Sequence, residues 1–418
     1  MGFVFASESV TEGHPDKMCD QLSDVLLDAF LKDDEQSRVA VECFAGNGLI
    51  VVGGEVTTDT YVDVQQVVRD RIVEVGFDDS LKGFDGNTCG VTVSLSAQSV
   101  EIAAGVDVPL EERESGVKSG LGAGDQGLMF GFAVRENPFL MPTPITLAHM
   151  LTKRLSVLRK TVDDFSWLFP DGKSQVVVGY DDAGVPVSVE HVLVSTQHSP
   201  YVGLDVVQKE VVEHVVWGVL KEYNELLEAG GFTPLVVSNT SMLVNPAGAW
   251  SLGGPKADAG LTGRKIIVDT YGGFARHGGG NFHGKDPSKV DRSAAYALRH
   301  VAKNIVAAGL ADKVELQICY AIGKAEPLGL MVDSFGTVRE GLTDAGLEKL
   351  IRDMVDLTPS GIIDRLGLTR VPNYVNVASY GHFGFNAEQH SMPWERLDLV
   401  DMFRGSVNYD RNMAGMGL

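Results

Sequence analysis

The spacing of apolar residues predicts the first elements of the chain. Between Pro15 and Phe30, apolar side chains recur every three or four positions, which predicts an amphipathic helix with Pro15 in its first turn. Two strand-like runs follow at 38–45 and 49–57, and the Gly46-Asn47-Gly48 stretch between them is typical of a hairpin. A second helix is expected over about 62–75, and further strands near 91–96 and 101–107.

The same patterns predict two more modules after a segment of different composition. Residues 108–127 carry Pro109, several acidic residues and many glycines, which indicates a mobile loop or linker. Beyond it, the expected strands lie at 128–134, 174–181, 185–195, 234–238, 313–322 and 328–335, and the expected helices near 144–160, 204–228, 288–308 and 343–354. Strand pairs alternate with too few helices for regular βαβ winding, which favours an α+β fold with antiparallel sheets. We expect an N-terminal α+β domain over 1–110, a mobile linker over 111–127, a central α+β domain over 128–240 and a C-terminal α+β domain over 241–418.

Charge and cysteine content exclude several classes of protein. The 418 residues include 35 Lys and Arg against 56 Asp and Glu, a formal charge of −21. Nucleic acids and acidic membranes attract positive surfaces, so neither is an expected partner. The four cysteines are scattered without a Cys-x-x-Cys pair. With no secretory leader and no apolar stretch of membrane-spanning length, we expect a cytoplasmic protein.

Residues 256–292 reverse the sign of the chain locally. They contain seven Lys and Arg, four Asp and eight glycines, a net charge of +3. Glycines let backbone N–H groups approach a ligand closely, and cations complement phosphate. The segment therefore predicts a pocket for a small polyanion, with a Gly-rich surface loop of solvated charges as the alternative.

Part of this segment resembles a P-loop but fails its pattern. The stretch 279–286 places Gly284-Lys285 correctly, but Asp286 replaces the Ser or Thr that binds magnesium, and no buried strand precedes it. A phosphate-loop kinase or ATPase is thus the weaker hypothesis. Lys285 and Lys289, four positions apart, can instead face one ligand from the start of a helix.

A second cluster lies at the start of the first predicted helix. His14 and Asp16 sit where the helix dipole favours anions, and Asp16 can bind a divalent metal that bridges phosphates. A plain helix cap remains the alternative for His14. Glu42 and Glu55 interrupt apolar strands, where a carboxylate is costly unless paired, although a solvent-facing position also explains each.

Five blocks of sequence, taken together, resemble the S-adenosylmethionine synthetases (methionine adenosyltransferases). They are 5–17 (FASESVTEGHPDK), 122–127 (GAGDQG), 170–175 (PDGKSQ), 258–265 (DAGLTGRK) and 279–293 (GGNFHGKDPSKVDRS). The resemblance runs in order from about residue 3 to about residue 400.

The resemblance implies three similar α+β modules in a pseudo-threefold arrangement. It also implies that the sulfur of L-methionine attacks C5′ of ATP, and that the released triphosphate is hydrolysed to phosphate and diphosphate. Catalysis would depend on positioning and preorganised charge, because the thioether has no proton to lose. The family forms homodimers, often paired into tetramers, with active sites at the dimer interface. His14 of one chain would then complete a site whose triphosphate lysines come from the other chain.

The resemblance also implies a role for each site residue. His14 would stabilise the leaving oxygen, and Lys173, Arg264, Lys265 and Lys285 would hold the triphosphate. Asp16 and Asp291 would bind two Mg²⁺ ions, and Glu42 would hold K⁺. Methionine would be bound by Glu55, Gln98, Asp258 and Lys289. Further contacts to ATP would come from Asp125, Asp171, Trp250, Asp258 and Asn281.

Two departures from the family pattern change what we expect. Asn281 and His283 replace the Ala and Ser that the family commonly places around Phe282, and a neutral His is a poor K⁺ ligand, so we expect weak K⁺ dependence. The loop 99–122, which gates the site in the family, is longer than usual and acidic. A silent binding subunit is disfavoured because the catalytic residue types are all present.

Overall fold

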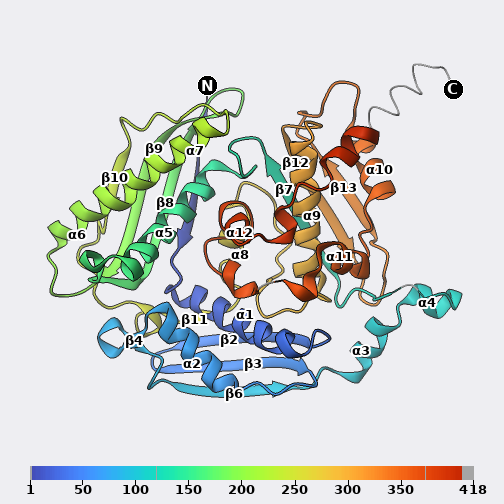
Figure 1. Cartoon of the computed structure of the whole chain (residues 1–418), viewed down its shortest axis with the longest axis horizontal. Helices are drawn as coiled ribbons and strands as arrows, with labels where there is room; N and C mark the ends of the chain where they lie inside the picture. The colour runs from blue at the N-terminus through green and yellow to red at the C-terminus, as the bar shows by residue number, and fades with distance from the viewer. Residues whose placement is uncertain (1, 119, 372, 407–418) are drawn as a thin grey trace.

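A computed structural model describes residues 2–118, 120–371 and 373–406, leaving aside the side chains of 100–103 (Figure 1). It contains three modules built on one plan, in which a long helix precedes a β-hairpin. In the N-terminal module, α1 (Pro15–Asp33) precedes β2 (Arg38–Gly46) and β3 (Leu49–Thr57). In the central module, α5 (Thr143–Thr161) precedes β8 (Leu168–Tyr180) and β9 (Pro186–His198). In the C-terminal module, α9 (Val290–Ala307) precedes β12 (Lys313–Tyr320) and β13 (Gly329–Asp333).

Each hairpin receives its flanking strand from a different part of the chain. β1 (Phe3–Val10) pairs antiparallel with β8, β7 (Gly127–Val134) with β12, and β11 (Gly260–Leu261) with β2. The N-terminal segment thus supplies a strand to the central sheet, the central segment to the C-terminal sheet, and the C-terminal segment to the N-terminal sheet. This cyclic exchange links the three modules.

Two sheets have a fourth strand, which runs parallel to its neighbour. β6 (Gly90–Ser96) lies beside β3, and β10 (Ser241–Val244) lies beside β9. The sheet orders are β11-β2-β3-β6, β1-β8-β9-β10 and β13-β12-β7. The expected α+β class with mainly antiparallel sheets and three similar modules is confirmed.

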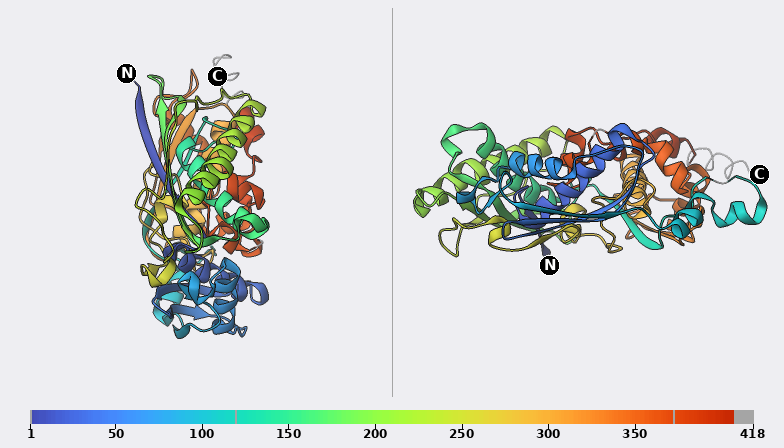
Figure 2. Two further views of the ribbon diagram at one scale, coloured as in Figure 1. Left: turned by 90° about the vertical axis from the view of Figure 1, so that its left-hand side faces the viewer. Right: turned by 90° about the horizontal axis from the view of Figure 1, so that it is seen from below.

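Helices cover one face of each sheet, as the two views of Figure 2 show. α1 packs on β2, α5 on β8 and β1, and α9 on β7 and β12. Other helices are α2 (Val64–Val75), α6 (Leu204–Glu210), α7 (Gly218–Ala229), α10 (Asp344–Met354) and α11 (Pro359–Leu366). A π-helical turn over Val211–Trp217 joins α6 to α7, so the long helix expected over 204–228 is continuous. Among the described residues, no helix combines the length and the apolar character needed to cross a membrane.

Two sequence-based expectations about elements are wrong. Residues 101–107 form a helix, α3 (Val100–Asp107), and α4 (Leu110–Ser115) follows inside the expected loop. Short apolar runs fit either period, so periodicity could not decide. Residues 234–238 contribute only a single bridge, Val236 to Ser188, instead of a strand.

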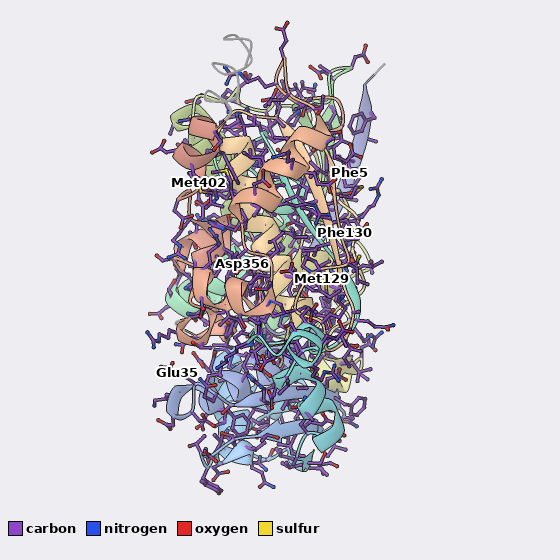
Figure 3. All side chains as sticks on the ribbon, turned by 90° about the vertical axis from the view of Figure 1, so that its right-hand side faces the viewer. Phe5, Glu35, Met129, Phe130, Asp356 and Met402 are labelled. Carbon is purple, nitrogen blue, oxygen red and sulfur yellow. The ribbon has the colours of Figure 1, made fainter. Side chains whose placement is uncertain are left out.

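The α3–α4 segment rests against the turn between β12 and β13. Leu110 donates its backbone N–H to the Gly323 carbonyl at 2.8 Å, and the Glu111 carboxylate accepts from the N–H of Ala325 at 3.1 Å. Figure 3, seen from the side of α10 and α11, shows this segment between the N-terminal module below and the C-terminal module above. The mobility expected for 111–127, and the division of the chain at 110, 127 and 240, stay predictions.

Candidate active site

His14 caps the N-terminus of α1 and is almost fully buried. Its Nδ1 accepts a hydrogen bond from the backbone N–H of Asp16 at 3.2 Å, so in the neutral ring the proton lies on Nε2. Burial, together with the charges of Lys265 and Lys173, lowers the pKa of His14 to about 3. The side chain is therefore a neutral hydrogen-bond donor at physiological pH.

Asp16 gathers the cations of the 260–265 segment around the start of α1. Its Oδ2 accepts from Lys265 Nζ at 2.6 Å, its Oδ1 accepts from the N–H of Leu261 at 3.0 Å, and Arg264 lies 3.7 Å away. Strand β11 brings this segment close: a Cβ on Gly260 would lie 2.2 Å from the Pro15 carbonyl oxygen. Glycine is required there by the approach of the two backbones.

Asp171 on β8 carries a buried oxygen without a partner. Its Oδ2 accepts from the N–H of Gly254 at 2.9 Å, whereas Oδ1 has no hydrogen-bond partner among the described residues. Burial raises the pKa of Asp171 to about 7. Asp258, which is exposed, also raises this pKa, and the exposed Lys173 opposes the effect. An orphaned buried carboxyl oxygen points to a polar ligand group.

Trp250 lies on the same loop as Gly254. Its backbone carbonyl accepts from His198 N–H at 2.9 Å, and its indole N–H donates to the Leu252 carbonyl at 2.8 Å, so the half-buried ring is held in place. We call this first set the His14 group. Its members are His14, Asp16, Asp171, Lys173, Trp250, Asp258, Arg264 and Lys265.

A second set surrounds the start of α9. Lys285 Nζ donates to Asp291 Oδ2 at 2.6 Å, and Lys289 Nζ to Asp286 Oδ2 at 2.5 Å. The expectation that Lys285 and Lys289 follow one another on a helix is wrong, because α9 begins at Val290 and Lys289 is its cap. Both lysines nevertheless lie in this set.

Pairing along β2 adds further residues to the second set. Ala40 on β2 pairs with Glu55 on β3 and forms a bridge with Lys285 on its other side, so β2 lies between Glu55 and Lys285. Gln98 follows β6 and donates its backbone N–H to Thr57 Oγ1 at 3.2 Å, at the end of β3. Gly124, beside the exposed Asp125, lies against the Ser288 backbone. We call the second set the Lys285 group: Glu55, Gln98, Asp125, Lys285, Lys289 and Asp291.

The two groups lie at different points along the same edge of β2. Gly284 accepts from the N–H of Val41 at 3.0 Å, and Gly260 pairs with Ala45. Four residues of strand separate these contacts by about 13 Å. The exposed Glu42 lies between them. Lys173 and Lys265 stand beside His14 of the same chain, so the expectation that all triphosphate lysines come from the other chain is wrong for these two.

The carboxylates expected to bind Mg²⁺ fit that ion. Asp16 and Asp291 offer hard oxygen ligands, and each now faces a lysine ammonium at 2.6 Å, so each already stands where positive charge is stabilised. Asp269, His283 and His382 also lie close enough together to hold a metal ion, but they fit one less well than Asp16 and Asp291 do. Lys17 already neutralises Asp269, and the two histidine Nε2 atoms contact each other at 2.9 Å.

Asn281 and His283 turn inward. Asn281 Oδ1 accepts from the His283 backbone N–H at 3.2 Å, and the His283 ring is fully buried beside Asp20. The sequence reasoning missed Asp20, Asp24 and Asp28 of α1, although they follow Asp16 at the helical spacing of four. Asp24 pairs with Arg292 at 2.7 Å and also accepts from Gly284 N–H at 2.8 Å.

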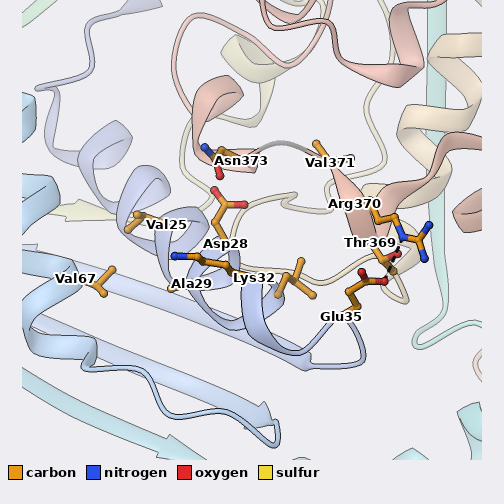
Figure 4. Close-up of a pocket in the computed structure, with 11 residues that line it drawn as sticks. Val25, Asp28, Ala29, Lys32, Glu35, Val67, Thr369, Arg370, Val371 and Asn373 are labelled. Carbon is orange, nitrogen blue, oxygen red and sulfur yellow. Dashed lines mark hydrogen bonds and ion pairs between the residues drawn. The ribbon is translucent and has the colours of Figure 1, made fainter.

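A cavity of about 450 Å³ lies apart from both groups (Figure 4). It is bounded by the C-terminal half of α1 and by Thr369, Arg370, Val371 and Asn373. Asp28 faces it, accepts from the N–H of Tyr374 at 2.7 Å and of Val375 at 2.9 Å, and has a pKa raised to about 7 by burial. Asp28 is twelve residues, or about 18 Å of helix, from Asp16.

Comparison with known proteins finds one family along nearly the whole chain. Family models match in order: the S-adenosylmethionine synthetase N-terminal domain at residues 2–100, the central domain at 120–250 and the C-terminal domain at 252–396. A protein of Corynebacterium diphtheriae called S-adenosylmethionine synthase is 53% identical over 404 residues, which cover 96% of each chain. Proteins with the same name from Nocardia farcinica and Leifsonia xyli are 52% and 53% identical, over 97% of this chain and 98% of theirs.

Proposed function

Because this chain belongs to the S-adenosylmethionine synthetase family, whose members are methionine adenosyltransferases, we propose that it joins ATP and L-methionine at a site completed by a second copy of the chain. In this reaction the methionine sulfur attacks C5′ of ATP, and S-adenosylmethionine forms as the triphosphate leaves. Water then cleaves the triphosphate to phosphate and diphosphate.

The observation that carries this proposal is the division of the cations into two groups. A triphosphate is a compact polyanion, and a chain of charge −21 offers it Lys173, Arg264 and Lys265 in one group and Lys285 in the other. The groups meet different parts of one β2 edge, and in this proposal a single chain presents two incomplete halves of a site. A homodimer related by a twofold axis would face the His14 group of each chain with the Lys285 group of its partner. Pairing of dimers into a tetramer is the further expectation from the family.

His14 is the residue that we propose acts on the leaving group. Departure of the triphosphate builds negative charge on the oxygen bonded to C5′. A neutral imidazole that donates from Nε2 stabilises this charge without transferring a proton. Its pKa of about 3 supports this role, because a histidine so held is neutral before ATP arrives.

The cations and carboxylates would share the triphosphate between them. Lys173, Arg264, Lys265 and Lys285 would contact its oxygens, with Arg264 and Lys265 also serving the hydrolysis. Asp16 and Asp291 would hold Mg²⁺, which supplies charge neutralisation when it is bound. Lys265 and Lys285, which now face these carboxylates, would contact phosphate oxygens of the bound triphosphate. Glu42, exposed between the groups, would be the K⁺ ligand.

The nucleoside and methionine would lie on either side of the triphosphate site. The Trp250 ring can stack on adenine, Asp171 Oδ1 can bind a ribose hydroxyl, and Asp125 and Asn281 would complete the ATP contacts. Glu55, Gln98, Asp258 and Lys289 would hold methionine, since a zwitterion needs both an anion for its ammonium and a cation for its carboxylate.

Product analysis tests the proposal. The protein is incubated with ATP, Mg²⁺ and L-methionine, and the products are separated and weighed by mass spectrometry. We expect a sulfonium compound with equal amounts of phosphate and diphosphate. ADP as the main nucleotide product would instead favour a kinase or ATPase and would overturn the proposal.

A further inference from the structure

The two phosphate-binding loops are joined inside the protein by a chain of buried side chains that the proposed reaction does not use. One end is the loop that carries Arg264 and Lys265, where Gly263 donates its N–H to Asp20 Oδ1 at 2.8 Å. The other end is the loop that carries Lys285, where Gly284 donates its N–H to Asp24 Oδ1 at 2.8 Å. His283, His382, Tyr296 and Arg292 lie between Asp20 and Asp24.

Proton positions at the Arg292 end follow from hydrogen-bond capacity. Arg292 pairs with Asp24 through both terminal nitrogens, at 2.8 and 2.7 Å, and its Nε donates to Tyr296 Oη at 3.0 Å. Among the described residues, the Tyr296 hydroxyl can donate to His382 Nδ1, which lies 2.7 Å away. His382 Nδ1 therefore accepts, and its proton must lie on Nε2.

The same reasoning applied from the other end gives a complementary result. His283 Nδ1 lies 3.0 Å from Asn281 Oδ1 and 3.2 Å from Asp20 Oδ1, and both atoms are acceptors. The amide orientation of Asn281 is fixed because the same oxygen accepts from the His283 backbone N–H. His283 therefore carries its proton on Nδ1 and leaves Nε2 as an acceptor.

The two assignments meet at the contact between the histidines. His382 Nε2–H donates to His283 Nε2 across 2.9 Å, so each of the four ring nitrogens is hydrogen-bonded while both rings are neutral. Burial, with the nearby cations Arg292 and Lys17, lowers the pKa of His382 well below its usual value, which is consistent with a neutral His382 ring. His382 is also fixed through its backbone, because it donates to the Asp269 carbonyl at 2.9 Å and accepts from the Trp394 indole N–H at 2.7 Å.

We infer that His283 and His382 are positioning residues, a neutral and directional hydrogen-bonded pair that fixes the spacing of the loops carrying Arg264, Lys265 and Lys285. His283 precedes Gly284-Lys285 directly, so its ring anchors the second loop to the Asp20 that holds the first. Cations that must meet developing charge lose much of their effect when they shift by about 1 Å. The inference rests on the proposed function for its catalytic consequence but not for the proton positions.

A spectroscopic measurement and a matched pair of variants test the inference. In ¹⁵N-histidine-labelled protein at pH 7, long-range ¹H–¹⁵N spectra should show His283 as the Nδ1–H tautomer and His382 as the Nε2–H tautomer. The Tyr296→Phe variant breaks the chain in its middle. The Tyr320→Phe variant also removes a buried tyrosine hydroxyl, which donates to the Leu357 carbonyl, but Tyr320 lies outside the chain of side chains.

We expect Tyr296→Phe to lower kcat about tenfold or more, and Tyr320→Phe to stay within about twofold of the unsubstituted protein. A cationic His283, an Nε2–H tautomer of His283, or equal kcat in the two variants would overturn the inference. If Tyr296→Phe does not fold, the tautomers of the unsubstituted protein still decide. Absence of any sulfonium product from the unsubstituted protein would overturn the proposed function and leave the tautomer result standing.

Discussion

Replacement of His14 by Asn separates its role as a helix cap from its proposed role in catalysis. Asn is as good an N-cap as any residue, and its Oδ1 can accept from the Asp16 N–H as Nδ1 does now. What Asn cannot supply is a donor at the distance of Nε2. Folding and ATP binding should therefore survive in His14→Asn, while the bond to the leaving oxygen is lost.

The expected loss follows from the burial of His14. The residue is only 4% exposed, so water cannot readily replace the missing donor. Removal of one preorganised donor to a developing oxyanion lowers a rate by about 10²–10³-fold, or about 3–4 kcal/mol. His14→Ala loses the cap as well and should also unfold more easily, by about 1 kcal/mol.

Single-turnover kinetics give the direct readout, because product release does not enter. Sulfonium formation is quenched and quantified by mass spectrometry, and ATP affinity is measured calorimetrically without methionine. The controls are the melting temperature and His14→Gln, whose amide can reach toward the Nε2 position and should retain more activity. A His14→Asn rate within about threefold of the unsubstituted protein, or a parallel loss of ATP binding, would refute the reasoning.

Three further predictions concern the nucleoside end and the monovalent cation. The pKa of Asp171 is about 7 in the folded protein and about 3.8 in the unfolded chain, so the folded state binds more protons and loses stability as pH rises from about 4 to 7. The melting temperature of Asp171→Asn should therefore rise relative to that of the unsubstituted protein over this pH range. A difference in melting temperature that stays constant with pH would contradict this. Trp250→Ala should raise the ATP KM about tenfold and Trp250→Phe less than about threefold, if stacking is the role of the ring; equal effects would argue against stacking. Because both His283 ring nitrogens are engaged, replacing K⁺ with tetramethylammonium at constant ionic strength should change kcat less than about threefold, and strong K⁺ activation would show this to be wrong.

Local patterns were enough to predict most helices and hairpins, and the five sequence blocks were enough to predict the family. Long amphipathic segments such as α1 have a clear period, and Gly46-Asn47-Gly48 marks a turn by its own chemistry. The exchange of β1, β7 and β11 between modules could not be predicted in this way. β11 is only two residues long, and its pairing depends on the packing of modules far apart in the chain.

The buried acids of α1 show the same limit within the site. Their spacing of four residues indicates one face of a helix, and that signal is present in the sequence. Which partner each acid meets is decided by the tertiary fold: Asp16 meets Lys265, Asp20 meets Lys17 and His283, and Asp24 meets Arg292, which is 268 positions away. Sequence reasoning therefore named candidate ligand contacts but not the side chains that hold them in place.

The central claim, that each active site combines the His14 group of one chain with the Lys285 group of another, can be tested by mixing damaged chains. His14→Asn and Lys285→Met chains carrying different tags are co-expressed, and hybrid dimers are isolated by two affinity steps. One site of each hybrid then receives both substitutions and the other receives neither. A hybrid of His14→Asn with Lys265→Met is the matched control, because both substitutions fall in the His14 group and each site is damaged once.

We expect the first hybrid to form S-adenosylmethionine at about half the rate of the unsubstituted dimer, and the control hybrid to remain nearly inactive. Sites built within single chains would give the opposite pattern for the first hybrid: each site would carry one substitution, and it would be as inactive as the control.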